Sequence, residues 1–274
     1  MTTDPAPPLR RRVQWTFTDG LVLVGRELGR LRHAPGELVA ALVFPAVMVV
    51  LFGYVFGSAI QVPDGGDYRE YLMPGLFAMV TFSAWLGVMT RMASDAARGV
   101  MDRFRSMPMA RWAVPFGQTG ADLLTGLLML TVMVGTGLLV GWQPHRGLTH
   151  TAQAFLLVIV LRYALSWAGV YVGLAVKNEQ TADAMVPLGL PFTMLSNAFV
   201  PTDGMPGWLR FLADWNPVSA LTAALRQLFG NPGAPSATAA WPLAHPVTAV
   251  LLWSATLLVI FIPLSLRAYT RKGR

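Results

Sequence analysis

Long apolar runs alternate with short charged segments along this sequence. Between Glu37 and Asp64 lie 26 residues without a charge, and between Glu70 and Arg91 lie 20. About 20 apolar residues are enough for a helix to cross the hydrocarbon core of a bilayer. The pattern therefore predicts an all-α membrane protein with six transmembrane helices. The expected transmembrane (TM) helices are TM1 38–60, TM2 71–90, TM3 112–142, TM4 148–176, TM5 184–202 and TM6 247–266.

The six spans are expected to form one transmembrane domain, residues 37–266. An N-terminal cytoplasmic segment, 1–36, precedes this domain, and a cytoplasmic tail, 267–274, follows it. Composition agrees with a membrane protein, because 54% of the residues are hydrophobic, 13% are charged and the mean hydropathy is +0.50. Soluble domains carry about 25% charged residues. The absence of cysteine excludes disulfides, iron–sulfur clusters and thiolate nucleophiles.

Basic residues are divided unequally between the two sides of the expected domain. Sixteen of the 21 Lys and Arg residues lie on the side of the termini and of the loop between TM2 and TM3, and four lie on the other side. Cytoplasmic loops are enriched in Lys and Arg, so both termini are predicted to be cytoplasmic. The net charge of +7 is thereby explained by topology, and nucleic acid is not an expected partner. No cleavable signal peptide is expected, since the basic cluster at 10–12 precedes a mixed polar segment.

Motifs of nucleotide hydrolysis and metal catalysis are missing from the sequence. A P-loop needs a lysine followed by Ser or Thr, whereas Lys177 precedes Asn178 and Lys272 precedes Gly273. The four histidines lack metal-ligand spacing, and neither HExxH nor GxSxG occurs. The chain is therefore expected not to be an enzyme and to hold no metal.

The polar loop between TM2 and TM3, residues 93–117, is the most informative segment. Asp95, Arg98, Asp102 and Arg105 recur at helical spacing, which predicts a cytoplasmic helix with a charged stripe. Such a helix is suited to docking on a cytosolic partner. The alternative is that its arginines only establish topology, although the interleaved acids argue against that.

Two further segments predict helices at the membrane surfaces. Residues 13–33 have the pattern of an amphipathic helix in the inner interface. Beyond TM5, the stretches 207–213 and 218–229 are helical in pattern but too short to span. We expect them to form a re-entrant hairpin on the outer side. The alternative places them in the outer interface, anchored by Trp208 and Trp215.

Inside the expected spans only Asp122 and Arg162 carry full charges. Charges within a bilayer are costly and tend to pair, and these two lie at comparable depth. We expect an interhelical pair that is either structural or part of a transport pathway. Phe77, Phe82 and Trp85 of TM2 are candidates for an adaptable hydrophobic substrate path, unless they are ordinary core or lipid-facing residues.

Several segments, in this order, resemble the type-2 ABC transporter permeases of the daunorubicin-resistance group. The similar segments are HAPGELVAALVFPAVMVVLFGYVFG at 33–57, YLMPG at 71–75, DxxxGxxDRxRSMP at 95–108, FVPTDGMPGWL at 199–209 and WNPVSALTAALR at 215–226. The resemblance implies a permease subunit that exports a hydrophobic drug, antibiotic or lipid-like compound through the cytoplasmic membrane of a bacterium.

The same resemblance implies partners and roles. Two copies of a separate ABC ATPase would bind ATP and Mg²⁺, so that no cofactor is expected on this chain. A second copy of the chain, or a similar permease, would complete a dimer in contact with membrane lipid. The loop would be the coupling segment, and 204–230 the outer re-entrant hairpin. The loop residues matching the family pattern are Gly99, Asp102, Arg103, Arg105 and Pro108, which join Asp95 and Arg98 of the charged stripe.

Three other functions stay open at this level. Export of a lipid-linked glycan uses a related architecture. An ion-coupled secondary transporter would need no ATPase, but such proteins often show internal repeats and several intramembrane ionisable groups. A membrane scaffold would use its loops only to recruit partners.

Overall fold

The computed structural model describes residues 25, 29, 35–56, 66–99, 113–233 and 239–271. Across these described residues the regular structure is entirely helical. Within this described part, four helices are long and apolar enough to cross a membrane, which supports a multi-pass membrane protein. They are α3 (Tyr68–Ala97), α5 (Ala113–Val140), α6 (Gly147–Ala175) and α12 (Pro246–Arg271).

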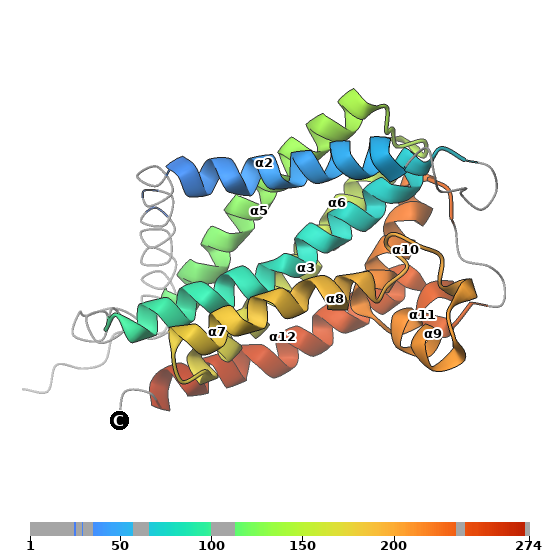
Figure 1. Cartoon of the computed structure of the whole chain (residues 1–274). Helices are drawn as coiled ribbons and strands as arrows, with labels where there is room; N and C mark the ends of the chain where they lie inside the picture. The colour runs from blue at the N-terminus through green and yellow to red at the C-terminus, as the bar shows by residue number, and fades with distance from the viewer. Residues whose placement is uncertain are drawn as a thin grey trace, which may run out of the picture.

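The central helix of the bundle is α3, which packs along α6, while α12 covers another side of α6 (Figure 1). Two glycines explain why α6 lies so close to α3. A Cβ atom on Gly169 would overlap the carbonyl oxygen of Trp85, and one on Gly173 would overlap that of Met89. A pair of small residues four positions apart lets two helix backbones approach in this way. In the most apolar stretch of α3, 78% of the residues are buried, compared with 17% in that of α12.

Only part of the first expected span, 38–60, lies within the described residues, and that part is helical. Helix α2 (Pro35–Leu51) continues into one wider turn, η1 (Phe52–Phe56), and residues 57–60 lie outside the described part. Helix α2 packs mainly on α5. The expected interfacial helix at 13–33 also lies outside the described residues, apart from helical Gly25 and Gly29.

The fifth expected span, 184–202, is not one continuous helix. The run is divided into α7 (Glu179–Met185), η3 (Val186–Leu188) and α8 (Gly189–Met194), followed by an irregular turn. Pro187 and Pro191 remove backbone donors within the run, which weakens a regular helix. The end of α8 is then capped by Asn216, whose Nδ2 donates to the carbonyls of Phe192 and Leu195 at 3.0 and 2.7 Å. The count of six spans therefore remains a prediction.

Both short helices predicted beyond this run are present in the structure, at one end of the molecule (Figure 1). They are α9 (Gly207–Asp214) and α10 (Pro217–Phe229), preceded by η4 (Thr202–Gly204) and followed by α11 (Trp241–Ala244). Asn216 caps α10 by accepting from the Val218 amide at 2.8 Å, and Pro217 occupies the first turn. Gly230 ends the helix with a φ of 75°.

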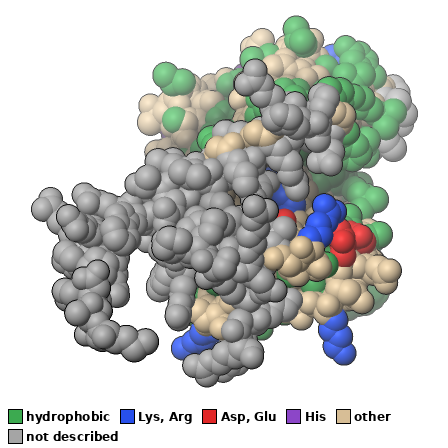
Figure 2. Space-filling view, turned by 90° about the vertical axis from the view of Figure 1, so that its left-hand side faces the viewer, with side chains coloured by type: hydrophobic (Ala, Val, Ile, Leu, Met, Phe, Trp, Pro, Cys, Tyr) green, Lys and Arg blue, Asp and Glu red, His purple; other side chains and the backbone are tan. Residues whose placement is uncertain are grey.

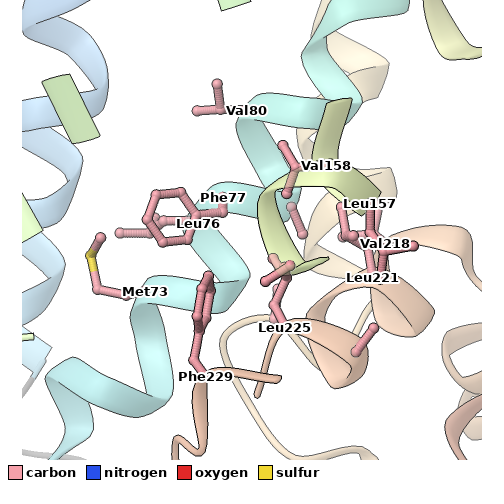
Figure 3. Packing of buried hydrophobic residues seen from close by; sticks show 14 of the residues in the cluster. Met73, Leu76, Phe77, Val80, Leu157, Val158, Val218, Leu221, Leu225 and Phe229 are labelled. Atoms are coloured by element: carbon pink, nitrogen blue, oxygen red, sulfur yellow. The ribbon is translucent and has the colours of Figure 1, made fainter. Parts of the chain in front are cut away.

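The hydrophobic core joins α3, α6 and α10 (Figure 3). Phe77 of α3 lies at its centre, with ring centroids 5.4 Å from Trp142, 5.7 Å from Phe155 and 6.0 Å from Phe229. Aromatic pairs at these separations contribute beyond simple burial. Helix α10 is thus part of the packed core, although it is too short to cross a bilayer.

Candidate functional site

A buried acid on α5 is shared by two arginines from different helices. Asp122 is 3% exposed, and its Oδ1 accepts from Nη2 of Arg162 on α6 at 3.1 Å. The same oxygen accepts from Nη2 of Arg91 on α3 at 3.0 Å. The two residues that the sequence suggests as a pair are therefore in contact. Arg91 also binds this acid. The predicted span ends at residue 90 and leaves Arg91 in the loop, whereas α3 continues to Ala97.

The Arg162 guanidinium has further partners in the same region. Its Nη1 donates to the carbonyl oxygen of Val80 at 2.9 Å, and its Nε donates to that of Asp122 at 3.4 Å. A Cβ atom at position 126 would overlap Arg162, so Gly126 provides the space that the guanidinium occupies. Buried charges are tolerated when they are paired and hydrogen-bonded. We call Arg91, Asp122 and Arg162 the charge cluster.

The C-terminal end of α3 carries the first residues of the predicted charged stripe, Asp95 and Arg98. Asp95 Oδ2 accepts from Gln118 Nε2 of α5 at 3.1 Å. Arg98 lies 3.7 Å from Glu179 of α7, where both side chains are exposed. Gly99, with a φ of 66°, follows the end of the helix. The remaining predicted coupling residues, which are Asp102, Arg103, Arg105 and Pro108, lie outside the described residues.

Charged side chains of both signs lie on this end of the molecule. Figure 2 views the end at which α3 and α12 terminate, and it shows Lys, Arg, Asp and Glu side chains there. The opposite end, which holds α9 and α11, exposes Trp208, Phe211, Trp215 and Trp241. The long helices thus run between a charged end and an end with exposed aromatic rings.

The three aromatic candidates for a substrate path do not share one environment. Phe77 is fully buried among aromatic rings, which favours the core role that the sequence also allows. Phe82 faces α8, and its ring stacks on Phe192 with centroids 4.6 Å apart. Trp85 lies 5.9 Å from Phe82, and no partner for its indole N–H is found within the described residues. Phe82 therefore lies against α8 with Trp85 next to it, and Phe77 lies in the aromatic part of the core.

A second buried arginine, Arg226, is one of the four basic residues predicted for the side opposite the termini, and it lies near the other end of α3. Nε and Nη2 of Arg226 donate to the carbonyl oxygen of Tyr71 at 3.2 and 3.1 Å, and Nη2 also donates to that of Ala198 at 3.2 Å. The guanidinium lies 3.7 Å from the centre of the Tyr71 ring, within cation–π distance. Its position at the last turn of an apolar helix was the available signal.

Helices α9 and α10 differ in their surroundings, although the sequence predicts them as one hairpin. Ala213 and Asp214 of α9 are buried, and Thr202 donates to Asp214 at 2.8 Å. The other face of α9 exposes 70% of Trp208 and 62% of Phe211. Most residues of α10 are buried.

Comparison with known proteins identifies similar chains. The family model described as "ABC-2 type transporter" matches residues 19–229. The daunorubicin resistance ABC transporter permease protein DrrB1 of Streptomyces coeruleorubidus is 30% identical over 252 residues, which are 90% of this chain and 84% of that protein. The doxorubicin resistance ABC transporter permease protein DrrB of Mycobacterium tuberculosis is 29% identical and covers 82% of this chain and 80% of its own length. The putative transport permease ycf38 of Cyanophora paradoxa is 22% identical over 77% of this chain and 73% of its own length.

Proposed function

Because this chain belongs to the ABC-2 type transporter family, we propose that it is the permease subunit of an ATP-driven exporter of a hydrophobic drug, antibiotic or lipid-like compound. The observation that carries this function is the 30% identity, over 90% of the chain, to a daunorubicin resistance permease. Four apolar helices of spanning length agree with a permease.

We propose that two copies of a separate ABC ATPase, which bind ATP and Mg²⁺, provide the energy for export by this permease. Residues 95–108 are the proposed coupling segment, with Asp102, Arg103 and Arg105 as its central charges. The support is positional, since α3 carries Asp95 and Arg98 to the charged end of the molecule (Figure 2). This end is accordingly the cytoplasmic one, as the excess of Lys and Arg also predicts.

The membrane pathway is proposed to form between two permease subunits. Apolar side chains are exposed on α2, at Phe44 and Val47, and around α8, at Leu188 and Leu190. Exposed apolar surface of this kind suits both lipid and a second subunit. Phe82, which is 7% exposed, and the half-buried Trp85 are the better candidates for contact with substrate, whereas Phe77 is completely enclosed and supports their helix.

At the outer side, we propose different roles for the two short helices, α9 and α10. The burial of α10 in protein suits a re-entrant element, because irregular backbone within a membrane needs protein around it. The exposed aromatic face of α9 suits the outer interface, where Trp side chains are enriched. The re-entrant element would then be α10 alone.

The test begins with purification of the chain from detergent-solubilised membranes of producing cells and identification of bound proteins by mass spectrometry. The wild type is compared with a triple variant carrying Asp102→Ala, Arg103→Ala and Arg105→Ala, and with Arg210→Ala on the opposite side as a control. We expect an ABC-type ATPase with the wild type and the control, and a loss of that ATPase from the triple variant.

Transport is measured in inverted membrane vesicles with daunorubicin as the probe. ATP should drive its uptake in the presence of an ionophore that dissipates ion gradients. Uptake that the ionophore abolishes, with no ATPase bound to the wild type, would contradict the proposal and indicate an ion-coupled transporter.

A further inference from the structure

We infer that Arg91 and Gln118 are positioning residues, which hold the two helices flanking the coupling segment in register and connect them to Arg162. This role depends on the proposed function, because it requires an ATPase that acts on the segment. Neither residue belongs to the predicted charged stripe. The juxtaposition that assigns the role is a ladder of polar contacts between α3 and α5.

The ladder has two rungs. Arg91 contacts Asp122 at 3.0 Å, and Asp95 contacts Gln118 at 3.1 Å. Along α3 the two rungs are four residues apart, and along α5 they are also four residues apart, in the opposite order. Positions four apart lie on one face of a helix, one turn from each other. The antiparallel helices that enter and leave residues 100–112 are thus linked at two successive turns.

From the Arg91–Asp122 rung, further contacts lead toward the middle of α3. From Asp122 the contacts pass to Arg162 at 3.1 Å and from there to the Val80 carbonyl oxygen at 2.9 Å. Val80 lies near the midpoint of α3, and Arg162 belongs to α6. Polar contacts therefore lead from the ends of α3 and α5 next to the coupling segment to the centre of the bundle.

The hydrogen bonds of both rungs are partly buried, and such bonds resist sliding more strongly than apolar contacts do. An apolar side chain slides past its neighbour with little change in burial, whereas a buried donor or acceptor that loses its partner is left desolvated and unpaired. The two rungs should therefore make α3 and α5 move as one unit. A displacement of the coupling segment would then reach α6 through Arg162.

The exposure of the three charged groups indicates which of them can be replaced while the protein stays folded. Arg162 and Asp122 are almost fully buried, whereas 26% of the Arg91 side chain is exposed. Removal of Arg91 leaves Asp122 paired with Arg162, so no buried charge loses its only counterion. Arg91 and Gln118 can accordingly be replaced with less risk to folding than the deeper pair.

The experiment measures probe molecules transported per ATP hydrolysed, in proteoliposomes that contain the chain and its co-purified ATPase. Arg91→Gln and Gln118→Leu should bind the ATPase and hydrolyse ATP as the wild type does. Their transport per ATP should fall about threefold to tenfold, which is the factor that one net hydrogen bond represents. Arg91→Lys retains a positively charged donor toward Asp122 and should recover most of the ratio.

A matched control comes from α5, the helix that carries Gln118. Thr131→Val removes a hydroxyl that donates to the Leu127 carbonyl of its own helix at 2.8 Å, so the ratio should stay unchanged. Suppose that the wild type transports the probe, and that Arg91→Gln and Gln118→Leu both transport as many probe molecules per ATP as it does. That result would overturn the positioning role alone. Absence of ATP-driven transport in the wild type would overturn the proposed function and this role with it.

Discussion

Arginines hold α3 near both of its ends, but they do so in different ways. In the inner half, which is the end proposed to be cytoplasmic, Arg91 and Arg162 share the carboxylate of Asp122, and Arg162 also donates to the backbone carbonyl of Val80. In the outer half, Arg226 binds the backbone carbonyls of Tyr71 and Ala198. A carboxylate shared by two side chains can keep both contacts through small changes of rotamer while the helices shift together, whereas a bond to two carbonyls requires both backbones to keep their places. The comparison indicates that the inner half can transmit movement, whereas the outer half is fixed to the backbone at Ala198. We call the Arg226 contacts with Tyr71 and Ala198 the seam.

The largest effect is expected where a counterion is removed from the inner half. Asp122→Asn leaves Arg162 buried without its carboxylate, and loss of one partner of a buried pair costs about 3 to 5 kcal/mol. Thermal unfolding in detergent, monitored by tryptophan fluorescence, should show a strongly lowered midpoint. Asp183→Asn, at an exposed position of α7, is the control.

A second variant tests whether the charge itself causes that loss. Asp122→Leu combined with Arg162→Met removes both buried charges, and it should be more stable than Asp122→Asn. If the double variant is the less stable of the two, the uncompensated charge is not the reason.

A smaller loss is expected for the arginine of the outer half. Arg226→Leu leaves two buried carbonyl oxygens without this donor and removes the contact with the Tyr71 ring, for an expected loss of about 2 to 3 kcal/mol. Arg226→Gln retains donors and should lose less. Arg210→Leu, near the surface of α9, should change stability by about 1 kcal/mol or less. The same unfolding measurement applies, and equal midpoints for Arg226→Leu and Arg210→Leu would contradict the seam.

Two glycines sharpen the comparison further. A Cβ atom on Gly75 would overlap the Ala198 backbone carbonyl, whereas one on Gly126 would overlap the Arg162 side chain. We expect Gly75→Ala and Gly126→Ala to lose about 1 to 3 kcal/mol, as overpacking commonly does. Gly75→Ala should lose more, since a backbone carbonyl yields less than a side chain.

Gly135 provides the matched control for these two variants. It lies on the same helix as Gly126, and the space around its expected Cβ is open. Gly135→Ala should therefore change the free energy of unfolding by about 1 kcal/mol or less. A larger loss from Gly126→Ala than from Gly75→Ala would reverse the proposed difference between the two halves.

The smallest effect on stability is expected at the exposed end of α3. Arg98 and Glu179 are 3.7 Å apart, with 71% and 41% of their side chains exposed. Exposed pairs contribute about 1 kcal/mol or less, and salt screens them. Arg98→Ala should shift the unfolding midpoint only slightly at low salt and not at high salt. A large shift that persists in high salt would show that this contact is structural.

The sequence predicted those features that depend on local pattern or on burial of charge. The long apolar runs predicted the positions of α3, α5, α6 and α12, because a bilayer-spanning helix needs about 20 apolar residues. Proline and glycine predicted the two short helices α9 and α10. Asp122 and Arg162 were suggested as a pair because intramembrane charges at equal depth have few other partners. The family resemblance was confirmed by the match over residues 19–229.

The tertiary structure alone decided which side chains join these groups. Arg91 reaches Asp122 only because α3 continues beyond the apolar run, and Gln118 reaches Asp95 only in the antiparallel register of α3 and α5. Arg226 binds Tyr71 from 155 positions away along the chain. Helical periodicity and charge spacing describe a helix relative to water and lipid, and they contain no information about which faces of distant helices meet. For that reason the sequence determined the class, the family and most of the spans of this protein, and packing determined how its buried charges are shared.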